Sequence, residues 1–216
     1  MKFDFNFYLS AIVAVIIGLS IGVISANYFS SQENIPVIDE PQGINRNVED
    51  ASQLVAGGPP KDGIPSIDDP LFVSVKDAKD WIQEDELVLL LEYKNKTKIY
   101  PLQIMVWHEI VNDYVAADPI AVTYCPLCGS GIAYHATVAG ERTEFGTTGK
   151  LLNSNLVMYD RNTDTYWTLI DGKAIEGPLK GDELEEVSIN TVVWRDILTA
   201  NITGQVLSKE TGFDRD

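Results

Sequence analysis

The longest apolar stretch of the chain lies at its N-terminus. No charged residue occurs from Phe5 to Gln32, and the segment Phe7–Phe29 is long enough to cross a bilayer at about 1.5 Å per residue. A cleaved signal peptide is the alternative, but its apolar core usually covers only about 7–15 residues. We therefore expect residues 1–29 to form one transmembrane anchor.

Charges around this stretch predict its orientation. Lys2 precedes it, whereas Glu33, Asp39 and Glu40 follow it, so the positive-inside bias leaves the N-terminus in the cytoplasm. Residues 30–56 are polar and acidic with few large apolar side chains, which is typical of a flexible tether. We therefore expect a single-pass membrane protein with its remaining residues outside the cytoplasm. The membrane is an expected partner through the N-terminal helix, and a protein partner stays open.

Residues 57–216 have the length and the alternating apolar pattern of one folded domain. Short helices are expected where Ser74, Pro101 and Thr191 provide helix starts: Val75–Ile82, Leu102–Val111 and Val192–Ala200. Strands are expected at Leu87–Tyr93, Thr97–Tyr100, Ile120–Tyr124, Ile132–Val138, Arg142–Phe145, Asn155–Tyr159, Tyr166–Ile170 and Val206–Ser208. Because strands outnumber helices, we predict an α+β fold with a mainly antiparallel β-sheet, preceded by the N-terminal transmembrane helix.

The charge of the chain narrows the classes of partner. It carries 32 acidic and 16 basic residues, a formal net charge of −16. Such a surface repels phosphate backbones and anionic lipid headgroups. We therefore expect no nucleic-acid partner.

The chemistry of the chain centres on its only two cysteines, Cys125 and Cys128, in a Cys-Pro-Leu-Cys-Gly run. An apolar strand precedes the run and an alternating segment follows it, so both cysteines are expected at the tip of a β-hairpin. A thioredoxin-type pair begins a helix, and c-type haem attachment needs a histidine where Gly129 stands. Three uses stay open: a metal site, a thiol–disulfide pair and a structural disulfide.

A metal site needs more ligands than the two thiols. His108 lies on the expected inward face of its helix, and Met158 offers a soft fourth ligand, so the predicted set is Cys125, Cys128, His108 and Met158. These soft donors favour copper or zinc over magnesium or calcium. The supporting residues around this set are predicted to be Glu109, Asp160 and Arg161.

An enzyme is the other class considered. His108 with Glu109 or Asp160 would suit general-base catalysis, but the chain has no Gly-x-Ser-x-Gly, P-loop or His-Glu-x-x-His motif. Whether the protein catalyses a reaction therefore stays open, and the leading hypothesis is an extracytoplasmic domain that binds copper or zinc in metal handling or redox.

From Gly57 onward the chain resembles a family known as domain of unknown function 3179. The resemblance implies an extracytoplasmic protein, often anchored in the membrane, with no assigned reaction, and it carries over His108, Cys125, Cys128, Met158, Asp160 and Arg161. The matching motifs are Gly-Gly-Pro-Pro-Lys-Asp-Gly-Ile-Pro at 57–65, Trp-His-Glu-Ile-Val-Asn-Asp at 107–113, Val-Thr-Tyr-Cys-Pro-Leu-Cys-Gly at 122–129, Gly-Lys-Leu at 149–151 and Met-Tyr-Asp-Arg at 158–161.

Overall fold

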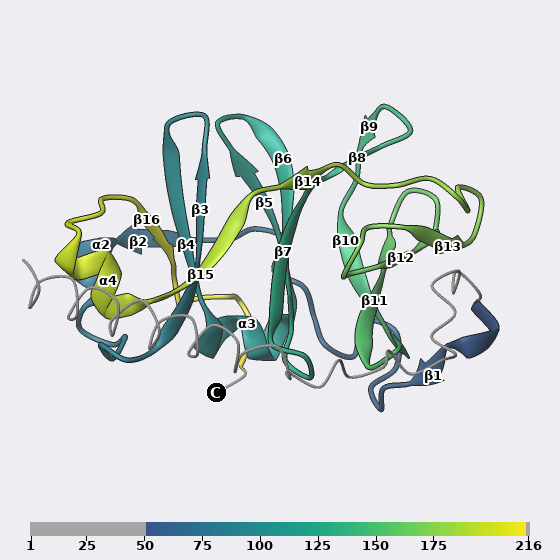
Figure 1. Ribbon diagram of the computed structural model, residues 1–216, viewed down its shortest axis with the longest axis horizontal. Helices are drawn as coiled ribbons and strands as arrows, with labels where there is room; N and C mark the ends of the chain where they lie inside the picture. The colour runs from purple at the N-terminus through teal and green to yellow at the C-terminus, as the bar shows by residue number, and fades with distance from the viewer. Residues whose placement is uncertain (1–50, 215–216) are drawn as a thin grey trace, which may run out of the picture. The chain divides into compact units, whose positions relative to one another are not determined.

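The computed structural model describes residues 51–214 (Figure 1). The expected membrane anchor and most of the tether, residues 1–50, lie outside these residues. Within the described part, no helix is both long and apolar enough to span a membrane. Strands dominate, and all the strand pairs are antiparallel except one, so the predicted α+β class with mainly antiparallel sheets is confirmed.

Three sheets build the described part of the chain. Sheet 1 has the order β1 (Val55–Ala56), β10 (Phe145–Leu152), β11 (Asn155–Asp160), β12 (Tyr166–Thr168) and β13 (Ala174–Glu176). Sheet 2 has the order β14 (Glu186–Val187), β7 (Ser130–His135), β6 (Asp118–Cys125) and β5 (Ile110–Val115). Sheet 3 has the order β15 (Ile189–Val193), β3 (Leu87–Tyr93), β4 (Lys96–Pro101), β16 (Gln205–Leu207) and β2 (Phe72–Ser74).

The remaining elements are short. A two-stranded ribbon pairs β8 (Thr137–Val138) with β9 (Glu141–Arg142). The helices are η1 (Ala51–Gln53), α2 (Val75–Ala78), α3 (Leu102–His108) and α4 (Trp194–Thr199). The Ser74 hydroxyl accepts a hydrogen bond from the Asp77 amide, as the predicted cap requires, but α2 is shorter than the expected Val75–Ile82.

Sheet 2 contributes to two hydrophobic cores because its strand β6 alternates. Ile120, Val122 and Tyr124 pack into one core together with residues of sheet 3. Ala121 and Cys125 point the other way, into a core shared with sheet 1. This alternation turns the Cys125 side chain toward the β10–β11 hairpin of sheet 1.

The helix predicted at Leu102–Val111 ends three residues earlier than expected. Glu109 adopts a left-handed conformation with φ of 60°, and its carbonyl accepts the amide of Tyr124 instead of continuing the helix. Ile110 and Val111 then begin β5, which pairs with β6 along its whole length. The prediction missed this strand because a left-handed residue other than glycine or asparagine has no clear sequence signal.

The glycine-proline segment at 57–65 forms an ordered lead-in that packs against sheet 1. The amides of Gly57 and Asp62 donate to carbonyls of β10, at Gly149 and Thr147. A Cβ atom at Gly149, where φ is 70°, would lie 2.1 Å from the Pro59 carbonyl oxygen, so this close approach requires glycine. The folded part also starts earlier than residue 57, because β1 pairs with β10 inside the predicted tether.

Candidate functional site: a hydrogen-bonded thiol beside a pocket

The two cysteines flank the turn of the β6–β7 hairpin, which confirms their predicted place at its tip. Cys125 ends β6, residues 126–129 form the turn, and Ser130 begins β7 directly opposite Cys125. The Gly129 amide donates to the Cys125 carbonyl at 2.9 Å, and Gly129 has a φ of 64°. The tight turn therefore holds Cys128 beside Ser130.

The environments of the two thiols differ. Cys125 is 1% exposed and belongs to the core between sheets 1 and 2, whereas Cys128 is exposed. Both thiols are free in the structure. One cysteine is therefore open to a reaction partner, and the other is accessible chiefly to its neighbour.

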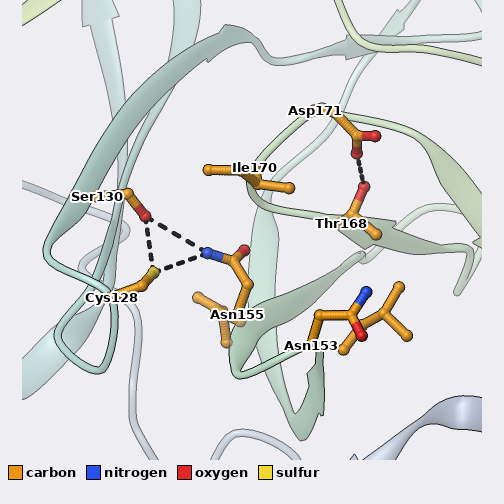
Figure 2. Close-up of a pocket in the computed structure, with 9 residues that line it drawn as sticks. Cys128, Ser130, Asn153, Asn155, Thr168, Ile170 and Asp171 are labelled. Carbon is orange, nitrogen blue, oxygen red and sulfur yellow. Dashed lines mark hydrogen bonds between the residues drawn. The ribbon is translucent and has the colours of Figure 1, made fainter. Parts of the chain in front are cut away.

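A second hairpin reaches Cys128 from sheet 1. Asn153 and Ser154 form the two-residue turn between β10 and β11, with φ values of 51° and 63° that suit a type I′ turn. Asn155 follows, and its Nδ2 donates to the Cys128 sulfur at 2.9 Å and reaches the Ser130 hydroxyl at 3.4 Å. The Ser130 hydroxyl itself lies 2.9 Å from the same sulfur (Figure 2).

Asn155 is 8% exposed, and its Oδ1 has no hydrogen-bond partner among the described residues. The polar contacts of this side chain are therefore those of its amino group to Cys128 and Ser130. Neither Asn155 nor Ser130 was predicted from the sequence to belong to the site. Polar residues between Leu152 and Leu156 do signal a turn, but only sheet packing places that turn against the cysteines.

The surroundings of the two thiols shift their pKa values in opposite directions. Burial raises the pKa of Cys125 above the ordinary value of a thiol. Burial acts the same way on Cys128, but hydrogen bonds from Ser130, interaction with the Cys125 thiol and the Asn155 amide together outweigh it and lower the pKa of Cys128. The exposed thiol is thus the one that ionises more readily.

A pocket of about 360 Å³ opens beside the Cys128 sulfur (Figure 2). Its walls come from the two hairpin turns and from the end of β12 with the loop that follows. The lining residues are Cys128, Ser130, Leu152, Asn153, Asn155, Leu156, Thr168, Ile170 and Asp171. The thiol therefore faces a space large enough for a side chain or a small molecule.

The structure does not group His108 with the two predicted thiol ligands. His108 is buried, its Nδ1 lies 2.8 Å from the Pro65 carbonyl oxygen, and its ring packs against Phe213. Met158 is fully buried on β11, within the core that also holds Cys125. Within residues 51–214, no three histidine, cysteine or carboxylate side chains come close enough together to hold a metal ion.

The predicted supporting residues have partners in the fold. The Asp160 carboxylate is buried and accepts hydrogen bonds from the Thr163 amide and hydroxyl, the Thr165 amide and the Trp167 indole. Arg161 forms ion pairs with Asp68 and Glu144, at 2.7 and 2.8 Å. Glu109, in turn, is the residue that ends α3.

Comparison with known proteins supplies a family and no function. A family model described as a protein of unknown function (DUF3179) matches residues 61–216, well over half of the chain. No curated protein and no solved structure matches the chain. The chain therefore belongs to the DUF3179 family, as its motifs indicated.

Proposed function

We propose that this protein carries out thiol–disulfide exchange, with Cys128 as the attacking thiolate and Cys125 as the resolving thiol. The observation that carries the proposal is the hydrogen bond from Asn155 and the 2.9 Å contact of the Ser130 hydroxyl at the sulfur of Cys128, an exposed residue that lines a pocket. The thiolate is the nucleophile in this chemistry, so groups that stabilise it promote attack.

The hydrogen bonds of this site take the place of a helix N-terminus. In a thioredoxin-type site, the N-terminus of a helix helps to stabilise the thiolate. Here β7 follows the cysteines instead of a helix, and the side chains of Asn155 and Ser130 with the Ser130 backbone surround the sulfur. A lowered Cys128 pKa therefore has a source that a search for a helical Cys-x-x-Cys motif overlooks.

The reaction proceeds in two balanced steps. The Cys128 thiolate attacks one sulfur of a substrate disulfide, the substrate S–S bond breaks, and the leaving thiolate takes a proton from water. Cys125 then attacks the Cys128 sulfur and the mixed S–S bond breaks. The proton of Cys125 passes through water to the departing thiolate, which leaves as the second substrate thiol, and a Cys125–Cys128 disulfide remains. Two electrons pass from the protein to the substrate, and an external dithiol reductant restores the protein.

The difference in burial suits this division of roles. Cys125 has a raised pKa and stays protonated while Cys128 attacks. It is also buried beside its neighbour, so external disulfides meet Cys128 first. The mixed disulfide on Cys128 is then the one that Cys125 resolves.

Copper or zinc binding is the competing proposal. Its support is the pair of free thiols at one turn, but one of its four predicted ligands, His108, is buried against Pro65 and Phe213 instead. Zinc sites in proteins hold four ligands, so a thiol pair alone fits zinc poorly. The location proposed with either function is extracytoplasmic and membrane-anchored, which rests on residues 1–29 of the sequence.

Trapping the intermediate tests the proposal. Full-length Cys125→Ser protein, mixed with a neutral aromatic disulfide, should accumulate a stable mixed disulfide on Cys128, visible by intact mass spectrometry. Cys128→Ser protein should react far more slowly, because its remaining thiol is buried and has a raised pKa. Equal reaction of both variants, or stoichiometric copper or zinc in the reduced wild-type protein, would contradict it.

A further inference from the structure

The pocket beside Cys128 indicates which substrate fits the site, if the protein carries out the proposed thiol–disulfide exchange. We infer that the pocket receives an apolar side chain next to the reacting cysteine of a protein disulfide, and that small anionic disulfides are poor substrates.

The walls of the pocket are the first argument. Leu152, Leu156 and Ile170 line it beside the thiol. The one lining carboxylate, on Asp171, accepts a hydrogen bond from the Thr168 hydroxyl and lies 3.4 Å from the Lys173 ammonium. The space next to Cys128 is therefore largely apolar, and burial of an apolar group there is favourable.

Charge is the second argument. Among the described residues that line the pocket, none is basic, and the nearby Lys173 is paired with Asp171. The chain as a whole has a net charge of −16, so it repels anions at a distance as well. A small disulfide with several carboxylates, such as glutathione disulfide, thus finds no counter-ion in the wall.

Exposed apolar residues beside the pocket favour a macromolecular substrate. Leu127, next to Cys128 in the turn, is 68% exposed. Ile170, which lies across the pocket from Ser130 (Figure 2), is 55% exposed. A small molecule inside the pocket leaves Leu127 in water. A polypeptide that presents its cysteine to Cys128 covers both residues, because its flanking residues extend past the pocket mouth.

The size of the pocket sets what enters it. A volume of about 360 Å³ lies at the small end of ligand sites, so the pocket takes one or two side chains and not a folded segment. The partner's cysteine therefore lies in an extended or loop segment, with a leucine-like residue beside it.

Competition between defined disulfides tests this inference. Full-length Cys125→Ser protein is mixed separately with glutathione disulfide and with two capped tetrapeptide disulfides of equal length, whose cysteines are flanked by leucine or by aspartate. Second-order rate constants for the mixed disulfide on Cys128 are measured by mass spectrometry. The leucine peptide should react about tenfold or more faster than the other two, as expected for one apolar side chain in a pocket.

Two matched variants locate the effect. Ile170→Asp should remove most of the preference for the leucine peptide, whereas Leu87→Asp adds the same charge at an exposed site on β3 and should leave it unchanged. Ile170→Ser is the milder variant if Ile170→Asp fails to fold, and circular dichroism checks each protein.

The outcomes separate the two proposals. Equal rates for all three disulfides, or a leucine preference that survives Ile170→Asp or Ile170→Ser, would overturn the substrate inference and leave thiol–disulfide exchange intact. Failure of Cys128 to react with any disulfide would overturn both.

Discussion

Two polar turns, one at Cys128 and one at Asp160, both hold residues that the sequence assigned to the candidate site, but their environments differ in the structure. At Asp160, the carboxylate is buried and four donors of neighbouring residues bind it. At Cys128, polar groups also converge on one sulfur, but the residue is exposed and lines a pocket. The first arrangement is closed, and the second is open to a reactant.

The difference shows how the same kind of interaction serves two purposes. Hydrogen bonds to the buried Asp160 fix the turn after β11 and satisfy an indole and two amides inside the fold. Hydrogen bonds to Cys128 instead stabilise the negative charge of a thiolate, which can attack the disulfide of a partner. Several hydrogen bonds to one side chain therefore indicate a reactive site only where a reactant can also reach that side chain.

The largest effect should come from breaking the closed turn. Asp160→Ala leaves the Trp167 indole and the Thr165 amide, both buried, and the half-buried Thr163 amide without their acceptor, and each buried unpaired group costs about 1–3 kcal/mol. We expect a loss of about 3 kcal/mol or more in the free energy of unfolding and a melting temperature roughly 10 °C lower. Calorimetry measures both.

The same variant should keep its reactive thiol. At a temperature where Asp160→Ala is folded, the rate of Cys128 alkylation should equal that of the wild type. Unchanged stability would contradict the structural role of the Asp160 turn. A folded variant with slow Cys128 alkylation would show that the two turns depend on each other.

A smaller effect should follow at the open turn. Asn155→Ala and Ser130→Ala each remove a donor to the Cys128 sulfur, so the pKa of Cys128 should rise toward that of an ordinary thiol. At a pH below the pKa, a rise of one unit in the pKa reduces the thiolate fraction about tenfold. Alkylation of Cys128 near neutral pH should therefore slow several-fold. Asn162→Ala is the control matched to Asn155→Ala, because it removes a side-chain amide that donates to the backbone carbonyl of Arg142 and not to Cys128.

The pH profile gives the sign of this effect. In the wild type, the lowered pKa keeps Cys128 ionised at pH values where an ordinary thiol is protonated, and its reactivity falls as the pH drops through that pKa. The Asn155→Ala and Ser130→Ala profiles should move to higher pH. Profiles that coincide with the wild type would mean that these hydrogen bonds do not stabilise the thiolate.

The hairpin tip could be predicted from the sequence because it is a local feature. β-branched and aromatic residues before Cys125 and glycines after Cys128 give strand, turn and strand within a short stretch. The contrast between the two thiols could not be predicted in this way. It depends on which face of β6 meets sheet 1 and on where the Asn153–Ser154 turn lies, and both are tertiary contacts.

His108 shows the opposite case. Its inward orientation was predicted and the residue is indeed buried, but an inward face has many possible neighbours. The lead-in carbonyl of Pro65 and the ring of Phe213, each far away in the sequence, occupy the space around its imidazole. Periodicity predicts that a side chain is buried, and long-range packing decides what it contacts.

The reduction potential of the Cys125–Cys128 pair tests the central claim most directly. Hydrogen bonds to the Cys128 thiolate stabilise the reduced form, which raises the potential above that of a structural disulfide. Full-length protein equilibrated with defined ratios of reduced and oxidised dithiothreitol or glutathione, and analysed by mass spectrometry, should give a value between roughly −270 and −120 mV. A value below about −300 mV would identify a structural bridge and contradict the account.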